Sequence, residues 1–168
     1  MRADRGQRYF FYGTLLDADV RRLVFGPTGE PELESAVLPG HRLLLARGRH
    51  YPVAVRSTIA DAAGVVTEPL GLEATERLAF YEGPDDYRAT TRCVRLVRGG
   101  KVEAQVFMPQ RRVAPSTIAW DLARWQRVVK PRFLKRVVEW MVQYRPSPAV
   151  LAERRRKGPE PGRRARTS

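Results

Sequence analysis

The sequence predicts an α+β domain with a small, mixed, mostly antiparallel sheet, flanking helices and a C-terminal helical extension. Two observations lead to this fold class. Through the first two-thirds of the chain, short apolar segments alternate with glycine and proline, which is typical of strands joined by tight turns. After about residue 116, apolar residues recur at helical spacing. The 168 residues are enough for one main domain with an appendage, and such a domain can bury a core without disulfides.

The first predicted element lies in the segment RYFFYGTLL, at residues 8–16. Four aromatic residues in succession, Tyr9 to Tyr12, favour an extended, buried strand because flat side chains pack well on a pleated surface. Gly13 ends this strand, and a glycine there lets a ligand approach the main chain closely. Residues 12–16 are therefore a candidate binding loop.

A short helix, several strands and a second helix are predicted next. Asp17 is suited to cap a helix over 18–25, because its carboxylate can accept hydrogen bonds from the first free amides. The segment 72–83 has helical spacing and ends at a Gly-Pro pair, which leaves Glu82 on the last turn or just beyond it. A Gly-Gly pair then joins two alternating segments into a hairpin. The predicted strands run over 33–38, 41–46, 52–56 and 64–68, with the hairpin strands over 87–97 and 101–108.

The C-terminal part is predicted as a helical extension over 116–146, followed by a disordered tail over 150–168. Lys130-Pro131 divides the extension into two helices, because proline disfavours helical structure in the residue before it. The three tryptophans of this part fall among its apolar positions, which favours docking on the domain or on a second subunit. The tail has few apolar groups and much like charge, and this composition predicts disorder.

The net charge of +13 is distributed unevenly. Residues 1–110 carry 15 Lys/Arg and 14 Asp/Glu, a local charge of +1. Residues 111–151 carry 9 Lys/Arg and 2 Asp/Glu, a local charge of +7. Residues 152–168 carry 7 Lys/Arg and 2 Asp/Glu, a local charge of +5. The front two-thirds therefore lack a nucleic-acid signature. The basic helices could still present arginines to RNA, DNA or an anionic surface, and the sequence leaves that alternative open.

Common catalytic motifs are absent from the sequence. It contains no glycine-rich phosphate loop, no paired cysteines, no His-x-x-x-His and no Gly-x-Ser-x-Gly. The single cysteine, Cys93, is predicted to be structural, His41 is expected at the surface, and His50 is expected in a turn. No apolar run approaches the roughly 20 residues that span a bilayer, and the first residues lack an apolar signal stretch. We therefore expect a cytoplasmic protein.

Three short motifs occur in an order that resembles the γ-glutamyl cyclotransferase-like family. They match the family's Tyr-Gly-Ser/Thr-Leu motif, its Tyr-Pro turn and its catalytic glutamate. The matching residues are Tyr12, Gly13, Thr14 and Leu15, then Tyr51 and Pro52, then Glu82 followed by Tyr87 and Arg88. The resemblance spans about residues 8–108 and places the family domain at 6–112. It implies a β-barrel-like version of the predicted sheet.

The resemblance also implies an intramolecular acyl transfer that uses no metal or organic cofactor. The α-amine of a γ-glutamyl group attacks its own γ-carbonyl, which releases an amine or amino acid and forms 5-oxoproline. The nucleophile belongs to the substrate, so the chain needs no activated serine or cysteine. Glu82 is the implied general acid and base. The implied substrate-binding residues are Tyr12, Gly13, Thr14, Leu15, Tyr51, Pro52 and Tyr87.

Physical chemistry supports these roles, although each residue type also has a structural interpretation. A partly buried carboxylate at the C-terminal end of a helix has a raised pKa, and a base works best near neutral pH. Amides in the turn at 12–16 can receive the substrate's α-carboxylate. Alternatively, this turn only ends a strand, and Tyr51 and Tyr87 are ordinary turn and strand aromatics. The scaffold would then be a noncatalytic module that binds a small ligand or, through its basic helices, a partner.

Overall fold

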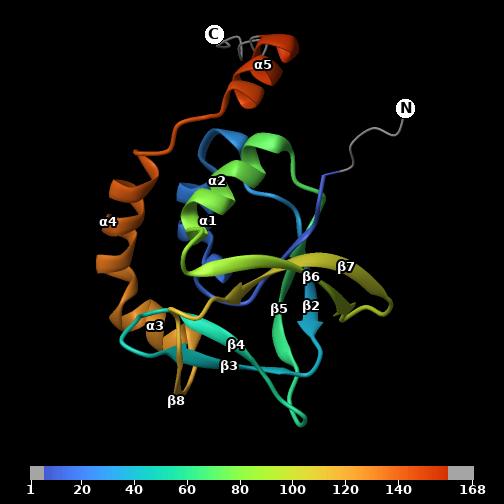
Figure 1. Cartoon of the computed structure of the whole chain (residues 1–168), viewed down its shortest axis with the longest axis vertical. Coiled ribbons are helices and arrows are strands. Elements are labelled where there is room, and N and C mark those ends of the chain that lie inside the picture. Colours follow the sequence, from blue (N-terminus) through green and yellow to red (C-terminus); the bar gives the residue numbers. More distant parts are fainter. Residues whose placement is uncertain (1–5, 159–168) are drawn as a thin grey trace, which may run out of the picture.

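The computed structural model describes residues 6–158, which form a closed five-stranded barrel, a second three-stranded sheet and a set of helices on one side (Figure 1). The barrel has the strand order β1-β5-β2-β6-β7, and the second sheet has the order β4-β3-β8. The strands are β1 (Tyr9–Phe11), β2 (Leu33–Leu38), β3 (His41–Ala46), β4 (Pro52–Arg56), β5 (Ala62–Thr67), β6 (Tyr87–Leu96), β7 (Lys101–Pro109) and β8 (Pro115–Ala119). The helices are α1 (Ala18–Phe25), α2 (Leu72–Glu82), α3 (Leu122–Val128), α4 (Lys130–Met141) and α5 (Pro148–Lys157), with short 3₁₀ helices at Thr14–Leu16 and Gly26–Thr28.

Strand β1 closes the barrel by pairing on both sides. It runs antiparallel to β5, with Phe10 opposite Val66, and parallel to β7, with Phe10 opposite Val106. The other barrel pairs, β2 with β5, β2 with β6 and β6 with β7, are antiparallel. These pairings confirm the predicted mixed, mostly antiparallel, barrel-like sheet.

The aromatic run in β1 is buried because the strand has a core on each face. Tyr9 and Phe11 pack into a cluster between the barrel and the helices. Phe10 and Tyr12 pack into the barrel interior. The alternation follows from the period of two along a strand, and it explains why a run without polar residues is stable here.

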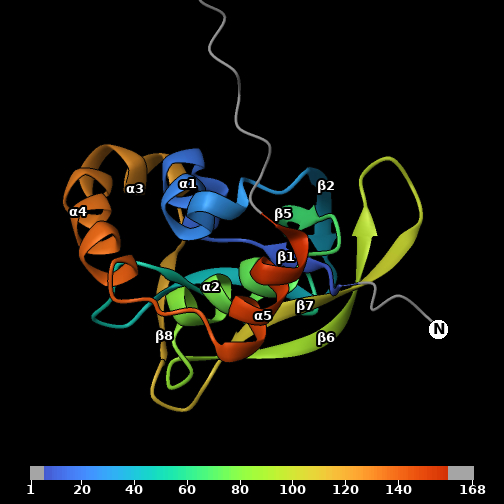
Figure 2. The same cartoon turned by 90° about the horizontal axis from the view of Figure 1, so that it is seen from above.

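The helices α1, α2 and α4 lie next to one another on the side of the barrel away from the β6–β7 hairpin (Figures 1 and 2). The predicted cap of α1 is confirmed, since the Asp17 carboxylate accepts hydrogen bonds from the amides of Asp19 and Val20. The second oxygen of Asp17 is 2.8 Å from the Lys130 Nζ and 2.9 Å from the Gln126 Nε2. One buried carboxylate therefore joins the start of α1 to α3 and α4.

Two predictions about the C-terminal part are wrong. Residues 115–119 form β8 instead of helix, because they pair with β3 in the second sheet and helix α3 begins only after its cap at Asp121. Residues 150–157 belong to helix α5, whereas they were assigned to a disordered tail. The Ser147 side chain caps α5, Val150 is buried, and an ion pair joins Arg154 to Glu73 on α2.

The rest of the predicted tail, residues 159–168, lies outside the described residues. The proposed boundary at residue 112 stays a prediction. The break between α3 and α4 falls at Val129, next to the predicted Lys130-Pro131 position. Trp125 is buried, as docking of the helices on the domain requires.

Two remaining expectations concern single residues. His41 is buried rather than at the surface, and its Nδ1 lies 2.9 Å from the carbonyl oxygen of Pro39. β3 is the central strand of the second sheet, paired with β4 and β8, so neither of its edges is open to solvent. Cys93 is exposed on β6. Within residues 6–158, none of the helices has the length and apolar composition to cross a membrane.

Candidate active site

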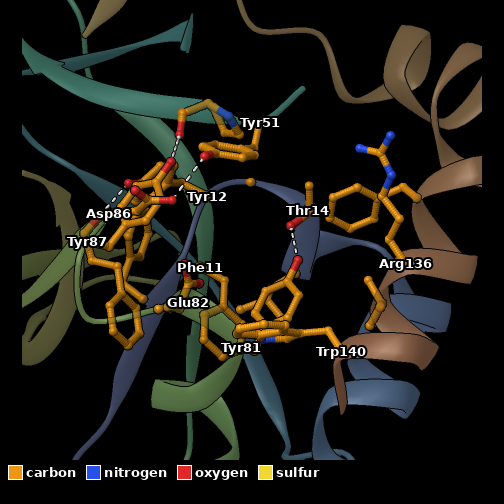
Figure 3. A pocket seen from close by; sticks show the side chains of 18 residues that line it. Phe11, Tyr12, Thr14, Tyr51, Tyr81, Glu82, Asp86, Tyr87, Arg136 and Trp140 are labelled. Carbon is orange, nitrogen blue, oxygen red and sulfur yellow. Dashed lines mark hydrogen bonds between the residues drawn. The ribbon is translucent and has the colours of Figure 1, made fainter. Parts of the chain in front are cut away.

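One pocket of about 290 Å³ lies where the loop after β1, the end of α2 and the helix α4 meet (Figure 3). The eight residues that the sequence assigned to a site all line this pocket. They come from four separate parts of the chain and are Tyr12, Gly13, Thr14, Leu15, Tyr51, Pro52, Glu82 and Tyr87. The structure therefore brings the three sequence motifs together in one place.

The loop after β1 is a tight turn whose first amides face no partner within the turn. The amide of Leu16 donates to the carbonyl of Gly13 over 2.9 Å, and the amide of Asp17 donates to Thr14 over 3.0 Å. These bonds leave the N–H groups of Thr14 and Leu15 without a partner inside the 3₁₀ helix, as at every helix start. The Tyr12 hydroxyl donates to the carbonyl of Phe107 on β7, which fixes the beginning of the loop to the barrel.

Gly13 is also needed for a reason that the sequence did not indicate. Its φ of −127° is negative, so the left-handed conformations that favour glycine are not used here. A Cβ at this position would lie 2.7 Å from the Cγ and 3.0 Å from the Cδ of Pro52. The space beside Gly13 is therefore filled by the Tyr-Pro turn, and the two motifs are in direct contact.

The loop is also tied to helix α2. The Thr14 Oγ1 and the Tyr81 hydroxyl oxygen are 2.6 Å apart, a hydrogen-bonding distance. Tyr81 is the residue before Glu82, so this bond sets the position of the last turn of α2 relative to the loop (Figure 3). Tyr81 was not predicted as a site residue. Its side chain lines the pocket, and its hydroxyl forms a polar contact that helical periodicity does not reveal.

Glu82 is the last residue of α2 and is half-buried. Loss of hydration on burial raises the pKa of its carboxyl group to about 8. Among the described residues, Glu73 on the same helix forms an ion pair with Arg154, but no lysine or arginine pairs with Glu82. The raised pKa of Glu82 agrees in direction with the expectation from the sequence. A carboxyl group with such a pKa holds its proton at neutral pH and can also release it, as proton transfer in both directions requires.

Tyr51 and Tyr87 form the wall of the pocket on the side of β4 and β6. Their ring centroids are 5.9 Å apart. The Tyr87 hydroxyl donates to the carbonyl of Pro52 over 2.8 Å, and the Tyr51 hydroxyl donates to the Asp86 carboxylate over 3.3 Å. Asp86 was not predicted as a site residue, because one acidic residue in the stretch EGPDDYR is not distinguished from another by spacing.

Helix α4 supplies a further wall that the sequence did not assign to the site. Four of its residues line the pocket, namely Phe133, Arg136, Val137 and Trp140. Trp140 is held in place by stacking on Phe80, with ring centroids 5.0 Å apart, and by donating its indole N–H to the Phe80 carbonyl. The apolar stripe on α4 predicted packing but not the surface it would meet. Among residues 6–158, no three His, Cys, Asp or Glu side chains gather to hold a metal ion.

Comparisons with known proteins agree with this fold. A family model described as "Gamma-glutamyl cyclotransferase, AIG2-like" matches residues 9–127. AIG2-like protein A from Arabidopsis thaliana is 30% identical over 127 residues, which cover 75% of this chain and 76% of that protein. The solution structure of another A. thaliana protein has a TM-score of 0.58 at 26% identity, covering 84% of this chain and 95% of that one. A γ-glutamyl cyclotransferase structure has a TM-score of 0.57 at 13% identity, covering 84% and 89%, and this likeness shows the fold alone.

The family match runs from β1 into α3 and so includes every site residue that the sequence predicted. It ends before α4, the helix that carries Arg136 and Trp140. The fold, the pocket and the length of the match agree on one assignment. The chain belongs to the AIG2-like γ-glutamyl cyclotransferase family.

Proposed function

We propose that the protein is a γ-glutamyl cyclotransferase that releases 5-oxoproline from a γ-glutamyl amine or amino acid, with Glu82 as general acid and base. The observation that carries this proposal is the position of Glu82. An unpaired carboxyl group with a pKa of about 8 lines the same pocket as the amides after β1. Family membership supports cyclotransferase-type chemistry.

The reaction forms one bond and breaks one. The substrate's α-nitrogen forms a bond to its own γ-carbonyl carbon, and the amide bond from that carbon to the leaving nitrogen breaks. The α-ammonium must first lose a proton, and the leaving nitrogen must gain one. No water is consumed. A single carboxyl group between the two nitrogens can accept the first proton and return it to the second.

The pKa of Glu82 suits this exchange. A carboxylate with an ordinary pKa is too weak a base to take a proton from an ammonium group, whereas burial brings the pKa of Glu82 close to that of an α-amine. When the substrate binds, its ammonium lies next to the carboxyl group and favours the ionised form. The proton then moves between groups of similar basicity.

The loop after β1 is suited to hold the other end of the glutamyl group. The N–H groups of Thr14 and Leu15 can donate to the substrate's α-carboxylate, and hydrogen bonds to a charged acceptor are among the stronger ones in proteins. The bond between Thr14 and Tyr81 keeps this loop in register with Glu82. Holding the amine and the γ-carbonyl within one pocket supplies the orientation that ring closure needs.

The proposal is tested by incubating the purified protein with a panel of γ-glutamyl amino acids and γ-glutamyl amines. We expect 5-oxoproline to appear in equal amounts with the free amine or amino acid. If the compounds bind to the pocket, as measured by calorimetry, but no 5-oxoproline forms, the protein is a binding module on the same scaffold. The three tryptophans give no support to a stacking surface for nucleic acid, because Trp125 is buried, Trp120 packs against it and Trp140 stacks on Phe80.

A further inference from the structure

Arg136 on α4 stands out among the described residues that line the pocket because it is the only one with a positive charge. The acidic lining residues are Glu82 and Asp86. Arg136 is exposed, so its guanidinium group is hydrated and accessible from solvent.

Arg136 has no partner among the described residues. On the same helix, Lys130 forms ion pairs with Asp17 and Asp19, whereas Arg136 forms none with a described residue. Its neighbour on the next turn, Trp140, is fixed by stacking on Phe80 and by a hydrogen bond to it. A guanidinium group beside a fixed aromatic wall, without a carboxylate of its own, is available to an anionic ligand.

The position of Arg136 indicates which part of a substrate it would meet. In Figure 3, Glu82 and Arg136 lie on opposite sides of the hydrogen-bonded pair of Thr14 and Tyr81. Under the proposed mechanism, the scissile amide bond lies at Glu82 and the glutamyl carboxylate lies at the loop amides. Arg136 is then left for a charged group on the leaving side of that bond.

Counting charges leads to the same assignment. A γ-glutamyl amino acid carries an α-ammonium, a glutamyl α-carboxylate and the carboxylate of the leaving amino acid. The acidic end of the pocket, with Glu82 and Asp86, suits the ammonium, and the loop amides suit the glutamyl carboxylate. The carboxylate of the leaving amino acid is then the only charged group of the substrate without a counterpart. Among the described residues that line the pocket, Arg136 is the only charged one without a counterpart.

We infer that Arg136 binds a carboxylate on the leaving group, so that the protein prefers γ-glutamyl amino acids to neutral γ-glutamyl amines. This inference rests on the proposed function and names the substrate class within it. Arg136 lies on α4, beyond residues 9–127 that the family model matches.

The test compares two substrates that differ only in the charge of the leaving group, γ-glutamyl-phenylalanine and γ-glutamyl-phenylalaninamide. We expect kcat/KM for the acid to exceed that for the amide by about tenfold, the size of one charge-assisted hydrogen bond at a partly exposed site. In Arg136→Gln this ratio should fall to about one, in Arg136→Lys it should be intermediate, and in the wild type it should fall as salt is added.

Arg132 provides the matched control. It is an exposed arginine one turn earlier on α4 and does not line the pocket. Arg132→Gln removes the same charge from the same helix and should keep the tenfold ratio. Loss of the ratio in this variant as well would show that the preference comes from the general positive field of α4, and it would overturn the inference.

Two other outcomes also overturn it. A wild-type ratio near one excludes a role for the leaving group's charge. An equal loss for both substrates in Arg136→Gln assigns Arg136 to the glutamyl carboxylate. Absence of 5-oxoproline from both substrates refutes the proposed function instead, and the ratio of calorimetric Kd values for acid and amide then tests Arg136 without turnover. A Kd ratio near one in that case overturns the inference as well.

Discussion

The hydroxyl groups of Thr14 and Tyr81 lie 2.6 Å apart and join the loop after β1 to the last turn of α2. These residues are 67 positions apart in the sequence. Each is next to a group with a proposed task, since Thr14 and Leu15 supply loop amides and Tyr81 precedes Glu82. The bond therefore fixes the distance between the part of the pocket that would hold the glutamyl carboxylate and the part that would move protons.

Replacement of Tyr81 by phenylalanine tests the importance of this bond. Tyr81→Phe keeps the ring and removes the hydroxyl, which should lower the free energy of unfolding by about 0.5–1.5 kcal/mol. Because the loop and Glu82 lose their register, we also expect KM for the γ-glutamyl substrate to rise several-fold. Tyr144→Phe is the matched control, since Tyr144 bonds to Glu76 away from the pocket. A similar rise of KM in both variants would contradict the positioning role of Tyr81.

Addition of a methyl group at Gly13 tests the contact between the two sequence motifs. In Gly13→Ala the new Cβ would lie 2.7 Å from the ring of Pro52, and a buried proline ring cannot move aside freely. We expect overpacking to lower the free energy of unfolding by about 1–3 kcal/mol, measured by urea denaturation. Gly71→Ala is the control, because no atom lies within 4 Å of its Cβ position and its φ is −71°. Equal stability changes in the two variants would refute the close packing at Gly13.

The sequence predicted the parts of the fold that depend on local patterns. Asp17 precedes an apolar helical stretch, so its capping role was visible in the sequence, and the glycine pair between β6 and β7 marked their hairpin. The bonds from Asp17 to Gln126 and Lys130 were not visible, because they join residues more than 100 positions apart. The docking of α4 depends on these distant bonds. For that reason Arg136, on the polar side of its helix pattern, could not be assigned to the pocket.

The errors at the C-terminus have the same origin. The segment at 115–119 has no strong strand pattern of its own and becomes a strand because β3 offers a free edge. Helix α5 has little amphipathic character and is stabilised by contacts with α2, among them the bond from Ser147 to Glu76. Composition alone describes such a segment as a charged tail. The position of Glu82 at the end of α2 was predicted correctly because helical spacing and a glycine stop coincide there.

The raised pKa of Glu82 predicts how stability depends on pH. Between its ordinary value of 4.5 and about 8, the folded protein keeps a proton that the unfolded chain has released, so stability falls as pH rises. Glu82→Gln has no carboxyl group at this position, so this fall of stability with rising pH should disappear. The variant should be more stable than the wild type by roughly 1–3 kcal/mol at pH 8, with little difference at pH 4.5. Urea denaturation at pH 4.5, 6 and 8 measures this, and a difference that does not change with pH would contradict it.

The same group should govern the pH dependence of the reaction. For an enzyme that needs ionised Glu82, kcat/KM rises about tenfold per pH unit at low pH and levels near pH 8. The rise of kcat should occur at lower pH than the rise of kcat/KM, because the ammonium of the bound substrate favours the ionised form of Glu82. Rates between pH 5 and 9 at fixed ionic strength give both curves. A flat profile across this range would exclude Glu82 as the ionising group.

The most direct measurement is 5-oxoproline release by Glu82→Gln compared with the wild type, together with the Kd of the substrate for each protein. Glutamine keeps the size of the side chain and cannot accept or return a proton. We expect kcat to fall by about 100-fold or more, the typical contribution of general acid–base catalysis, while Kd changes little. Glu139→Gln, at an exposed carboxylate on α4, should behave as the wild type. Turnover by Glu82→Gln at the wild-type rate would contradict the assignment of Glu82 as the catalytic acid and base.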